Sequence, residues 1–287
     1  MESAIFPKKT TMNAFGDFES LYEENNKLNN LLFLITQKFK NQNDDYLSRE
    51  KYLKIFLIKI ASTNQTLINS YKSIKINVNN KNAEIIDYPS IFLLSRAILE
   101  TYLTMEYLYF NELSDEEKDF RFKLWRMSGF MLRQNALKEF KDYSELLIRE
   151  KEEIEKAKSE IKESKYYWQI NEKLWQLDKF GIPRILSWIK IIENSKLRTK
   201  LFSGFYQLYS NYAHSEFLSM MQLYSIGYNP TNEVLNMSKS SLIIANSVLS
   251  HCMKNLTSHY ESAKNIFENF DENSKSILTY WFENSKE

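Results

Sequence analysis

Apolar residues recur along most of the chain at the spacing of three and four that places them on one face of an α-helix. This spacing predicts a first helix over about 18–41 and a second over about 47–76. The polar stretch NVNNKNAE ends the second helix, and a short run at 74–78 is the one segment that resembles a strand. We therefore expect an N-terminal pair of helices within residues 17–80.

Capping residues indicate where the central helices begin. Asp87 and Pro89 open a long apolar segment, and proline suits the first turn of a helix. The sequence from Ser114 to Glu117 has the form of a capping box, which predicts a helix that ends near Lys141. Both signals place helix starts directly before apolar periodic stretches.

Four further helices are expected towards the C-terminus. The apolar stretch IPRILSWIKII predicts a short helix at 182–192, and a longer one follows at 197–226. Gly227 and Pro230 end this longer helix. Residues 232–262 and the stretch SKSILTYWFEN predict the last two helices.

The segment 144–165 differs from the other predicted helices. Its apolar residues Leu147, Ile154 and Ile161 form a narrow stripe with a spacing of seven, and charged residues fill most other positions. Such a stripe is typical of a projecting helix that touches one neighbour. Two interpretations stay open: an arm that binds a protein partner, and, as the pattern favours, a solvated helix face.

The predicted fold class is all-α, a multi-helix bundle with one projecting charged helix. The sequence shows no internal repeat and no linker rich in Pro, Gly or Ser, so we expect a single helical domain over 1–287. Its parts are the helical pair at 17–80, a motif-bearing core at 88–227 that includes the charged arm at 144–165, and C-terminal helices at 231–284.

Composition narrows the function classes. The 287 residues include only 5 Gly and 4 Pro, fewer than turn-dense β folds or glycine-rich phosphate loops require. The 38 basic residues nearly balance the 37 acidic ones, so any nucleic-acid contact must use a local patch. The one cysteine, Cys252, excludes an internal disulfide and a multi-cysteine zinc site.

The sequence favours a cytoplasmic protein without a membrane span. The N-terminus MESAIFPKKTTMN lacks the apolar run of a signal peptide. The window 88–110 is long enough to cross a bilayer, but it contains Arg96, Glu100 and Glu106, which are unfavourable in lipid. We therefore interpret this window as a buried core helix.

A polar stripe lies within the predicted helix at 197–226. Tyr206, Ser210 and His214 follow one another at intervals of four, and each step of four turns only 40° around the helix, so the three share one face. The surrounding residues are largely apolar. Buried polar groups need hydrogen-bond partners, so this stripe is expected to contact another polar group.

Arg96 and Glu100 are the expected partners of this stripe. They lie one turn apart in the apolar window, where charged residues are rarely buried unless they are paired. The simplest arrangement that pairs these groups packs the helix in the window 88–110 against the helix at 197–226. Arg96 or Glu100 would then contact Tyr206, Ser210 or His214. The sequence thus predicts a shared cluster of five side chains, away from bulk water.

The Arg-x-x-x-Glu and Tyr-x-x-x-Ser-x-x-x-His motifs formed by these residues resemble those of a family of bacterial helical proteins of unknown function. Over about 88–227 the chain is also similar in outline to the HEPN superfamily of prokaryotic helical domains. Many HEPN proteins are metal-independent ribonucleases of toxin or antiphage systems, and they pair two Arg-x(4–6)-His motifs across a homodimer. The resemblance implies an RNase that needs no cofactor.

The resemblance also implies a role for each residue of the cluster. His214 is the expected general acid and base, because histidine transfers protons near neutral pH. Arg96 is expected to bind phosphate and to stabilise developing charge. Tyr206 and Ser210 would position the imidazole, while Glu100 would orient the guanidinium.

This chain departs from the HEPN motif in one respect. Gln207, Leu208 and Tyr209 occupy the positions where an arginine should precede His214. The RNase hypothesis therefore requires Arg96 to supply the cation from the neighbouring helix. The alternative is a non-catalytic helical module that binds a protein or nucleotide partner, with the same cluster serving as a structural polar network.

Other candidate residues carry weaker signals. Arg126 and Arg133 are seven residues apart in a segment that interleaves basic and aromatic residues, so both could contact phosphates, although amphipathic packing is the alternative. Lys165-Tyr-Tyr-Trp168 is a further candidate for base stacking. His251 and His259 are eight residues apart without the spacing of a metal site, so no metal is expected.

Overall fold

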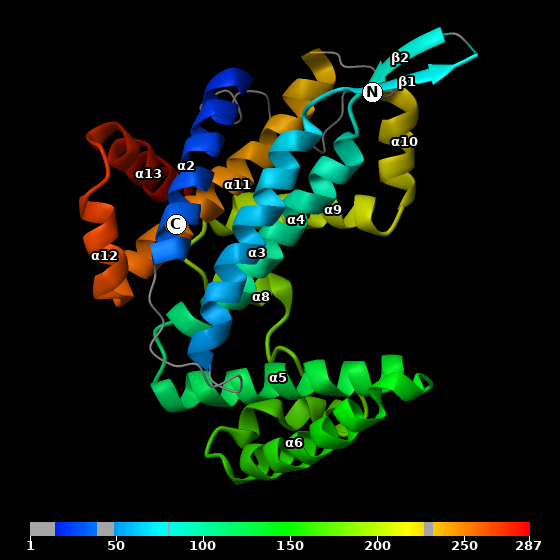
Figure 1. The fold of residues 1–287 in the computed structure, drawn as a ribbon, viewed down its shortest axis with the longest axis vertical. Coiled ribbons are helices and arrows are strands. Elements are labelled where there is room, and N and C mark those ends of the chain that lie inside the picture. Colours follow the sequence, from blue (N-terminus) through cyan, green and yellow to red (C-terminus); the bar gives the residue numbers. More distant parts are fainter. Residues whose placement is uncertain (1–14, 39–48, 80, 227–231) are drawn as a thin grey trace. The chain divides into compact units, whose positions relative to one another are not determined.

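The computed structural model describes residues 15–38, 49–79, 81–226 and 232–287 (Figure 1). Apart from turns and loops, this part of the chain is helical, with one small two-stranded sheet and an isolated bridge between Leu197 and Lys286, which confirms the all-α fold class. It separates into two compact units. The first comprises Met1–Met105 and Ser195–Glu287, and the second comprises Glu106–Asn194. The organisation as a single domain stays a prediction.

Four long helices form the centre of the first unit. They are α2 (Phe18–Lys38), α3 (Arg49–Ser70), α4 (Tyr88–Met105) and α11 (Asn232–His259). Helix α11 packs against α2 and α4, and α3 packs against α2 and α4. Their apolar stripes meet in a core from which water is excluded, and this burial is the main favourable term for folding. Fully buried core residues include Leu28, Leu32, Leu57, Ile60, Leu99 and Leu249.

Shorter helices surround this centre. Helix α9 (Thr199–Ala213) packs on α4, and α10 (Phe217–Ile226) packs on α9. Helices α12 (Glu261–Glu268) and α13 (Glu272–Ser285) contact α2 and α11. The sequence pattern had predicted one helix over 232–262, so α12 was missed.

A β-hairpin joins α3 to α4. Strand β1 (Ile74–Val78) confirms the predicted strand at 74–78 and pairs antiparallel with β2 (Lys81–Ile85). Asn79 adopts a left-handed conformation with φ of 52°, which asparagine tolerates better than most residues and which suits a tight hairpin turn. The predicted second helix, at 47–76, therefore ends early, at Ser70. Strand β2 was missed because most of its side chains are polar and exposed.

The second unit is built on the pair α5 (Asp115–Leu137) and α6 (Ser144–Glu163), which pack along one another. The predicted cap is present, since the Ser114 hydroxyl accepts a hydrogen bond from the Glu117 backbone N–H at 3.3 Å. In α6, Ile154 and Ile161 are buried and Leu147 is half-buried. The narrow apolar stripe of the charged arm therefore faces mainly one neighbour, α5.

Short elements complete the second unit. They are the π-helix η1 (Glu106–Phe110), the 3-10 helices η2 (Lys141–Tyr143) and η3 (Tyr167–Lys173), and the short helices α7 (Leu174–Leu177) and α8 (Trp188–Glu193). The helix predicted at 182–192 is thus shorter than expected. Ser187 has an extended backbone and caps α8 by accepting from the Lys190 backbone N–H, so the helix begins only after it.

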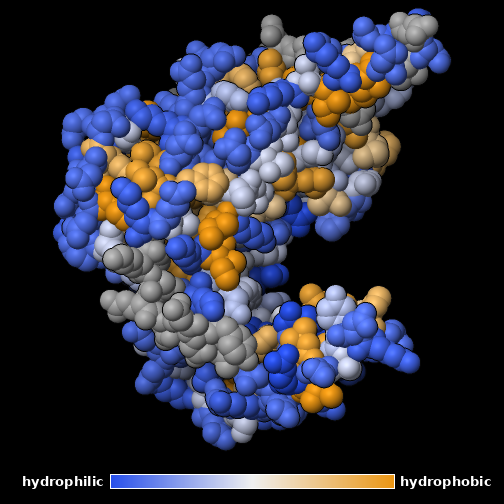
Figure 2. All heavy atoms as spheres, in the orientation of Figure 1, coloured by the Kyte–Doolittle hydropathy of each residue, from blue (hydrophilic) through white to orange (hydrophobic). Residues whose placement is uncertain are grey.

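Hydrophobic and hydrophilic side chains alternate over the visible face of the molecule (Figure 2). In the part of the view that α5 and α6 occupy in Figure 1, strongly hydrophilic residues lie directly beside hydrophobic ones. Exposed apolar side chains next to charged ones are candidates for contact with a ligand or partner.

Within the described ranges, no helix combines the length and the apolar character needed to cross a bilayer.

Candidate functional site

The predicted meeting of the two motif-bearing helices is present in the first unit, where α4 and α9 pack together. Phe92 stacks on Tyr209 with ring centres 4.8 Å apart, and Tyr88 and Phe92 both contact Tyr212 edge-on. Residue numbers rise along α4 as they fall along α9, so the helices run antiparallel. These rings are buried and hold the pair together.

Arg96 lies one turn beyond this aromatic contact. Its Nε donates a hydrogen bond to Glu100 Oε1 at 2.9 Å, and its guanidinium lies 5.2 Å from the centre of the Tyr206 ring. Only 16% of the Arg96 side chain is exposed, against 28% for Glu100. The carboxylate and the aromatic face therefore fix the guanidinium from two sides, as an ion pair and a cation–π contact do.

The outer nitrogens of this guanidinium remain available. Neither Nη1 nor Nη2 of Arg96 makes a hydrogen bond to any residue that the structure describes. A guanidinium presents its donors in a fixed planar fork that matches the oxygens of a carboxylate or phosphate. Both outer nitrogens of Arg96 thus lie outside its ion pair with Glu100.

Ser210 does not extend this cluster towards His214. Its hydroxyl donates to the backbone carbonyl of Tyr206 at 2.7 Å, a contact within α9 that serine commonly makes in helices. Ser210 and Tyr206 are both half-buried. The serine therefore satisfies its own donor locally, and it does not hold the imidazole in the described structure.

His214 lies at the end of α9, because the predicted helix at 197–226 is two helices. Ser215 takes a left-handed conformation with φ of 52°. The N–H of Glu216 then bonds to the carbonyl of Asn211 at 2.9 Å, and that of Ser215 to the carbonyl of Tyr212 at 3.4 Å. These two bonds form a Schellman motif, which ends a helix. Periodicity could not reveal this break because no glycine marks it.

The break changes the environment expected for His214. The residue is exposed, and neither ring nitrogen makes a hydrogen bond to a residue within the described ranges. Between Tyr206 and His214 the helix rises by about 12 Å over eight residues. Within one chain, Arg96 contacts the helix two turns away from His214. The structure thus brings Arg96, Glu100 and Tyr206 together, places Ser210 one turn further on, and keeps His214 apart.

The weaker nucleic-acid candidates lie on α5 in the second unit. Nε of Arg133 donates to Glu150 Oε2 at 3.1 Å, and its Nη2 donates to the other oxygen of the same carboxylate. Only 6% of the Glu150 side chain is exposed. Arg126 is half-buried, with its guanidinium 6.0 Å from the Phe122 ring. Two nitrogens of Arg133 are therefore already engaged by a buried acid, while 43% of its side chain is exposed.

His251 is a buried residue with structural contacts. Its Nε2 lies 3.1 Å from the Ser285 hydroxyl, and its ring packs between Tyr102 and Phe282. Burial lowers the pKa of His251 to about 3. The neighbouring Cys252 is also buried. In the part of the chain that is described, no group of three or more His, Cys, Asp or Glu side chains could hold a metal ion.

A fully buried polar network is present, but at a different place from the one predicted. Asn64 donates to Asn25 at 2.9 Å, and Asn25 donates to Asn246 at 2.6 Å, which links α3, α2 and α11. All three residues are completely buried. The sequence signal was weak, because single asparagines in three separate helices have no common spacing. Such a network favours one arrangement of the three helices over others.

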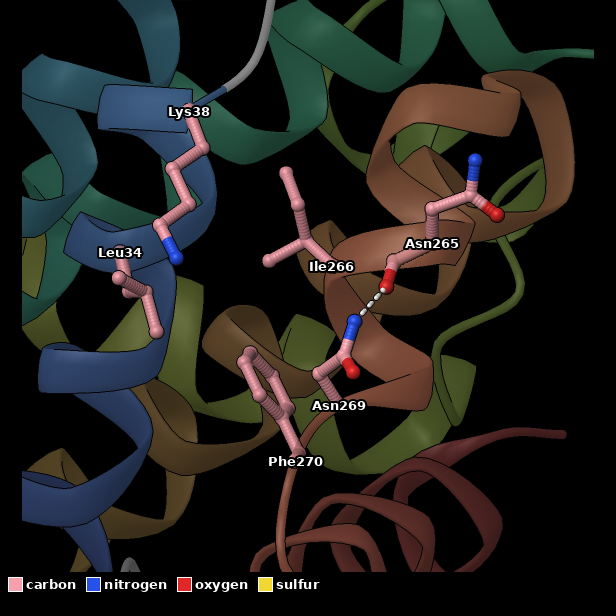
Figure 3. A pocket seen from close by; sticks show the side chains of 6 residues that line it. All are labelled: Leu34, Lys38, Asn265, Ile266, Asn269 and Phe270. Carbon is pink, nitrogen blue, oxygen red and sulfur yellow. Dashed lines mark hydrogen bonds between the residues drawn. The ribbon is translucent and has the colours of Figure 1, made fainter.

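Two hollows lie away from the Arg96 cluster. The larger, of about 320 Å³, is lined by residues of α2 and α12 and the loop after α12, and the Lys38 ammonium is at its edge (Figure 3). The other, of about 280 Å³, is lined by residues of α2 and α13. Arg96 lines neither hollow.

Comparison with known proteins places the chain in a family. A model of a family of unknown function, DUF5677, matches residues 60–230, which is more than half of the chain and includes both α4 and α9. No curated protein and no solved structure gives a significant match. The chain therefore belongs to the DUF5677 family of unknown function.

Proposed function

We propose that this protein is a HEPN-like, metal-independent ribonuclease, active in the cytoplasm as part of a bacterial toxin or antiphage system. One observation carries the proposal: the guanidinium of Arg96 is fixed by Glu100 and Tyr206, while its outer nitrogens make no hydrogen bond to a described residue. The phosphodiester of a nucleic acid is one polymer group that matches this fork, and the HEPN resemblance selects RNA.

Arg96 has two roles in this proposal. It binds a non-bridging oxygen of the scissile phosphate, and it stabilises the negative charge that grows there in the transition state. Because Glu100 and Tyr206 already fix the guanidinium, little conformational freedom is lost when the phosphate binds. Glu100 and Tyr206 are thus positioning residues for Arg96.

His214 is the proposed proton-transfer group. Its exposed imidazole can accept the proton of a ribose 2′-hydroxyl, which then attacks the adjacent phosphorus and displaces the 5′-oxygen of the next nucleotide. Water protonates the leaving 5′-oxygen, the imidazolium of His214 returns its proton to solvent, and the products are a 2′,3′-cyclic phosphate and a 5′-hydroxyl. This reaction is specific to RNA, since DNA lacks the 2′-hydroxyl.

Because Arg96 and His214 lie apart in one chain, the proposal requires two copies to share the site. We propose a homodimer in which Arg96 of one copy faces His214 of the other, as the HEPN resemblance suggests. Helix α10 follows His214 directly and supports this arrangement. It carries no charged residue, and Phe217 and Tyr224 are 80% and 93% exposed. An uncharged apolar face can pair with its own copy without charge repulsion.

A second candidate function is favoured by a different surface. Leu132, Phe140, Tyr143 and Ile148 are exposed apolar residues where α5 leads into α6. A non-catalytic module could bind a protein partner there through the charged arm. This alternative predicts that Ile148→Asp abolishes partner binding, while His214→Ala leaves it intact.

Incubation with RNA tests the ribonuclease proposal. The full chain is mixed with labelled single-stranded RNA in the presence of EDTA, alongside His214→Ala and Arg96→Ala variants. Removing either group should slow cleavage by about 100-fold or more, while DNA of the same sequence stays intact. Equal cleavage by all three proteins, or cleavage by none, would contradict the proposal.

A further inference from the structure

A short segment of the second unit exposes large aromatic side chains. Between Lys165 and Lys190, the rings of Trp168, Trp175 and Phe180 are 65%, 62% and 63% exposed. Aromatic side chains are normally among the main contributors to a core, so several exposed rings in one short segment require an explanation.

This segment is anchored to the rest of its unit. Ile170 and Leu177 are buried on either side of Trp175. Gly181 adopts a φ of 72° and lies so close to Ser128 that an added Cβ would be 2.4 Å from the serine Oγ. The exposed rings therefore belong to a segment whose backbone is held in place by close contacts.

The same segment carries two cations, Lys173 and Arg184, that lie close to each other. The Lys173 ammonium donates to the backbone carbonyls of Arg184 and Ile185, which brings the start of α7 next to the residues before α8. The Arg184 guanidinium in turn lies 4.0 Å from the centre of the Trp188 ring. Burial lowers the pKa of Lys173, and the nearby charge of Arg184 lowers it further. Two cations thus lie close enough to repel each other.

The charge of the segment favours a polyanion. Residues 165–190 contain five basic and two acidic residues. One of the acids, Asp178, already pairs with Lys158 of α6 at 3.5 Å. The lysines at the two ends of the range, Lys165 and Lys190, pair with glutamates outside it. The remaining charges are those of Lys173, Lys179 and Arg184 against Glu172. A polyanion that also carries planar rings would satisfy both the cations and the exposed aromatic side chains, and single-stranded nucleic acid has this chemistry.

We propose that Lys173, Trp175, Arg184 and Trp188 form a binding surface for single-stranded RNA, which we call the tryptophan surface. Bases stack on the exposed ring of Trp175, and phosphates lie against Lys173 and Arg184, with Trp188 supporting the guanidinium. The inference rests on the proposed function for the choice of RNA as the nucleic acid. It does not depend on His214 or on cleavage.

Binding of a fluorescently labelled single-stranded RNA of about 15 nucleotides tests this surface. The full chain carries His214→Ala in every sample, so that the RNA stays intact, and anisotropy reports the dissociation constant. Trp175→Ala should weaken binding at least about fivefold, the lower end of what the loss of one stacked base causes. Arg184→Gln should also lower the steepness of the plot of the logarithm of the association constant against the logarithm of the salt concentration, by about 0.7.

Lys151→Gln is the matched control, because it removes a cation from the exposed face of α6 in the same unit. It should change the dissociation constant less than twofold. Trp175 is largely exposed, so Trp175→Ala should leave the melting temperature unchanged. Three results would overturn the inference: no RNA binding, binding unaffected by Trp175→Ala, or an equal loss in the control. RNA binding without cleavage by the unmodified chain would refute only the proposed function.

Discussion

Two helix pairs of this protein each carry an arginine that the sequence suggests for phosphate binding, and the two arginines differ in what they can do. In the α4–α9 pair, Arg96 uses only Nε to bind Glu100, and its guanidinium lies over the Tyr206 ring. In the α5–α6 pair, Arg133 uses Nε and Nη2 together on the carboxylate of Glu150.

The difference lies in how the acid is held. Glu150 is 6% exposed, so its charge needs a full bidentate partner, and Arg133 supplies it. Glu100 is 28% exposed and is partly solvated, so a single hydrogen bond from Arg96 is sufficient. A buried acidic neighbour therefore engages two nitrogens of its arginine, whereas a partly solvated one engages a single nitrogen and leaves more donors for a ligand.

The largest effect expected from this comparison is on stability. Arg133→Gln should reduce the free energy of unfolding by about 3 kcal/mol, because it leaves the Glu150 carboxylate buried without its partner. Urea unfolding followed by circular dichroism measures the change. Arg96→Gln is the matched variant and should reduce stability by at most about 1 kcal/mol, since its pair is partly solvated. Similar losses in both variants would contradict the distinction between the two arginines.

A smaller effect on the free energy of unfolding is expected from the two histidines. His251 is buried and His214 is exposed. The pKa of His251 is about 3 in the folded protein, below its ordinary value of 6.5. At pH values between these two pKa values, His251 is protonated in the unfolded chain and neutral in the folded chain. Stability is therefore retained above pH 6.5 and lost as the pH falls, by up to about 2 kcal/mol at pH 5.

Unfolding experiments between pH 7 and about 5 test this linkage. His251→Gln should flatten the dependence of stability on pH, because glutamine does not titrate, although the variant will be less stable at pH 7. His214→Gln is the control, and its pH dependence should match that of the unmodified protein. If His251→Gln and His214→Gln show the same slope, the buried position of His251 does not control the acid sensitivity.

Much of the helical framework could be predicted from the sequence. The apolar spacing identified α2, α3 and α4 as helices, and the Ser114 cap identified the start of α5. The contact between Arg96 and Tyr206 was also within reach, because charged and polar residues on apolar helices need partners. Each of these features follows from a local pattern or from a single physical requirement.

The environment of His214 could not be predicted in this way. It depends on Ser215, a residue that rarely adopts a left-handed conformation and gives no signal in the sequence. The buried acid at Glu150 was also hidden, because it stands among many exposed charges in α6. Both features are set by three-dimensional contacts that no spacing rule encodes.

Mixing two inactive variants tests most directly whether Arg96 and His214 act together across two copies. Arg96→Gln and His214→Ala chains are unfolded and refolded separately or as an equimolar mixture, and RNA cleavage is measured. Half of the dimers in a random mixture contain one chain of each kind, and each such dimer keeps one intact site of two, so the mixture should recover about a quarter of the unmodified activity. A mixture as inactive as either variant alone would contradict the shared site.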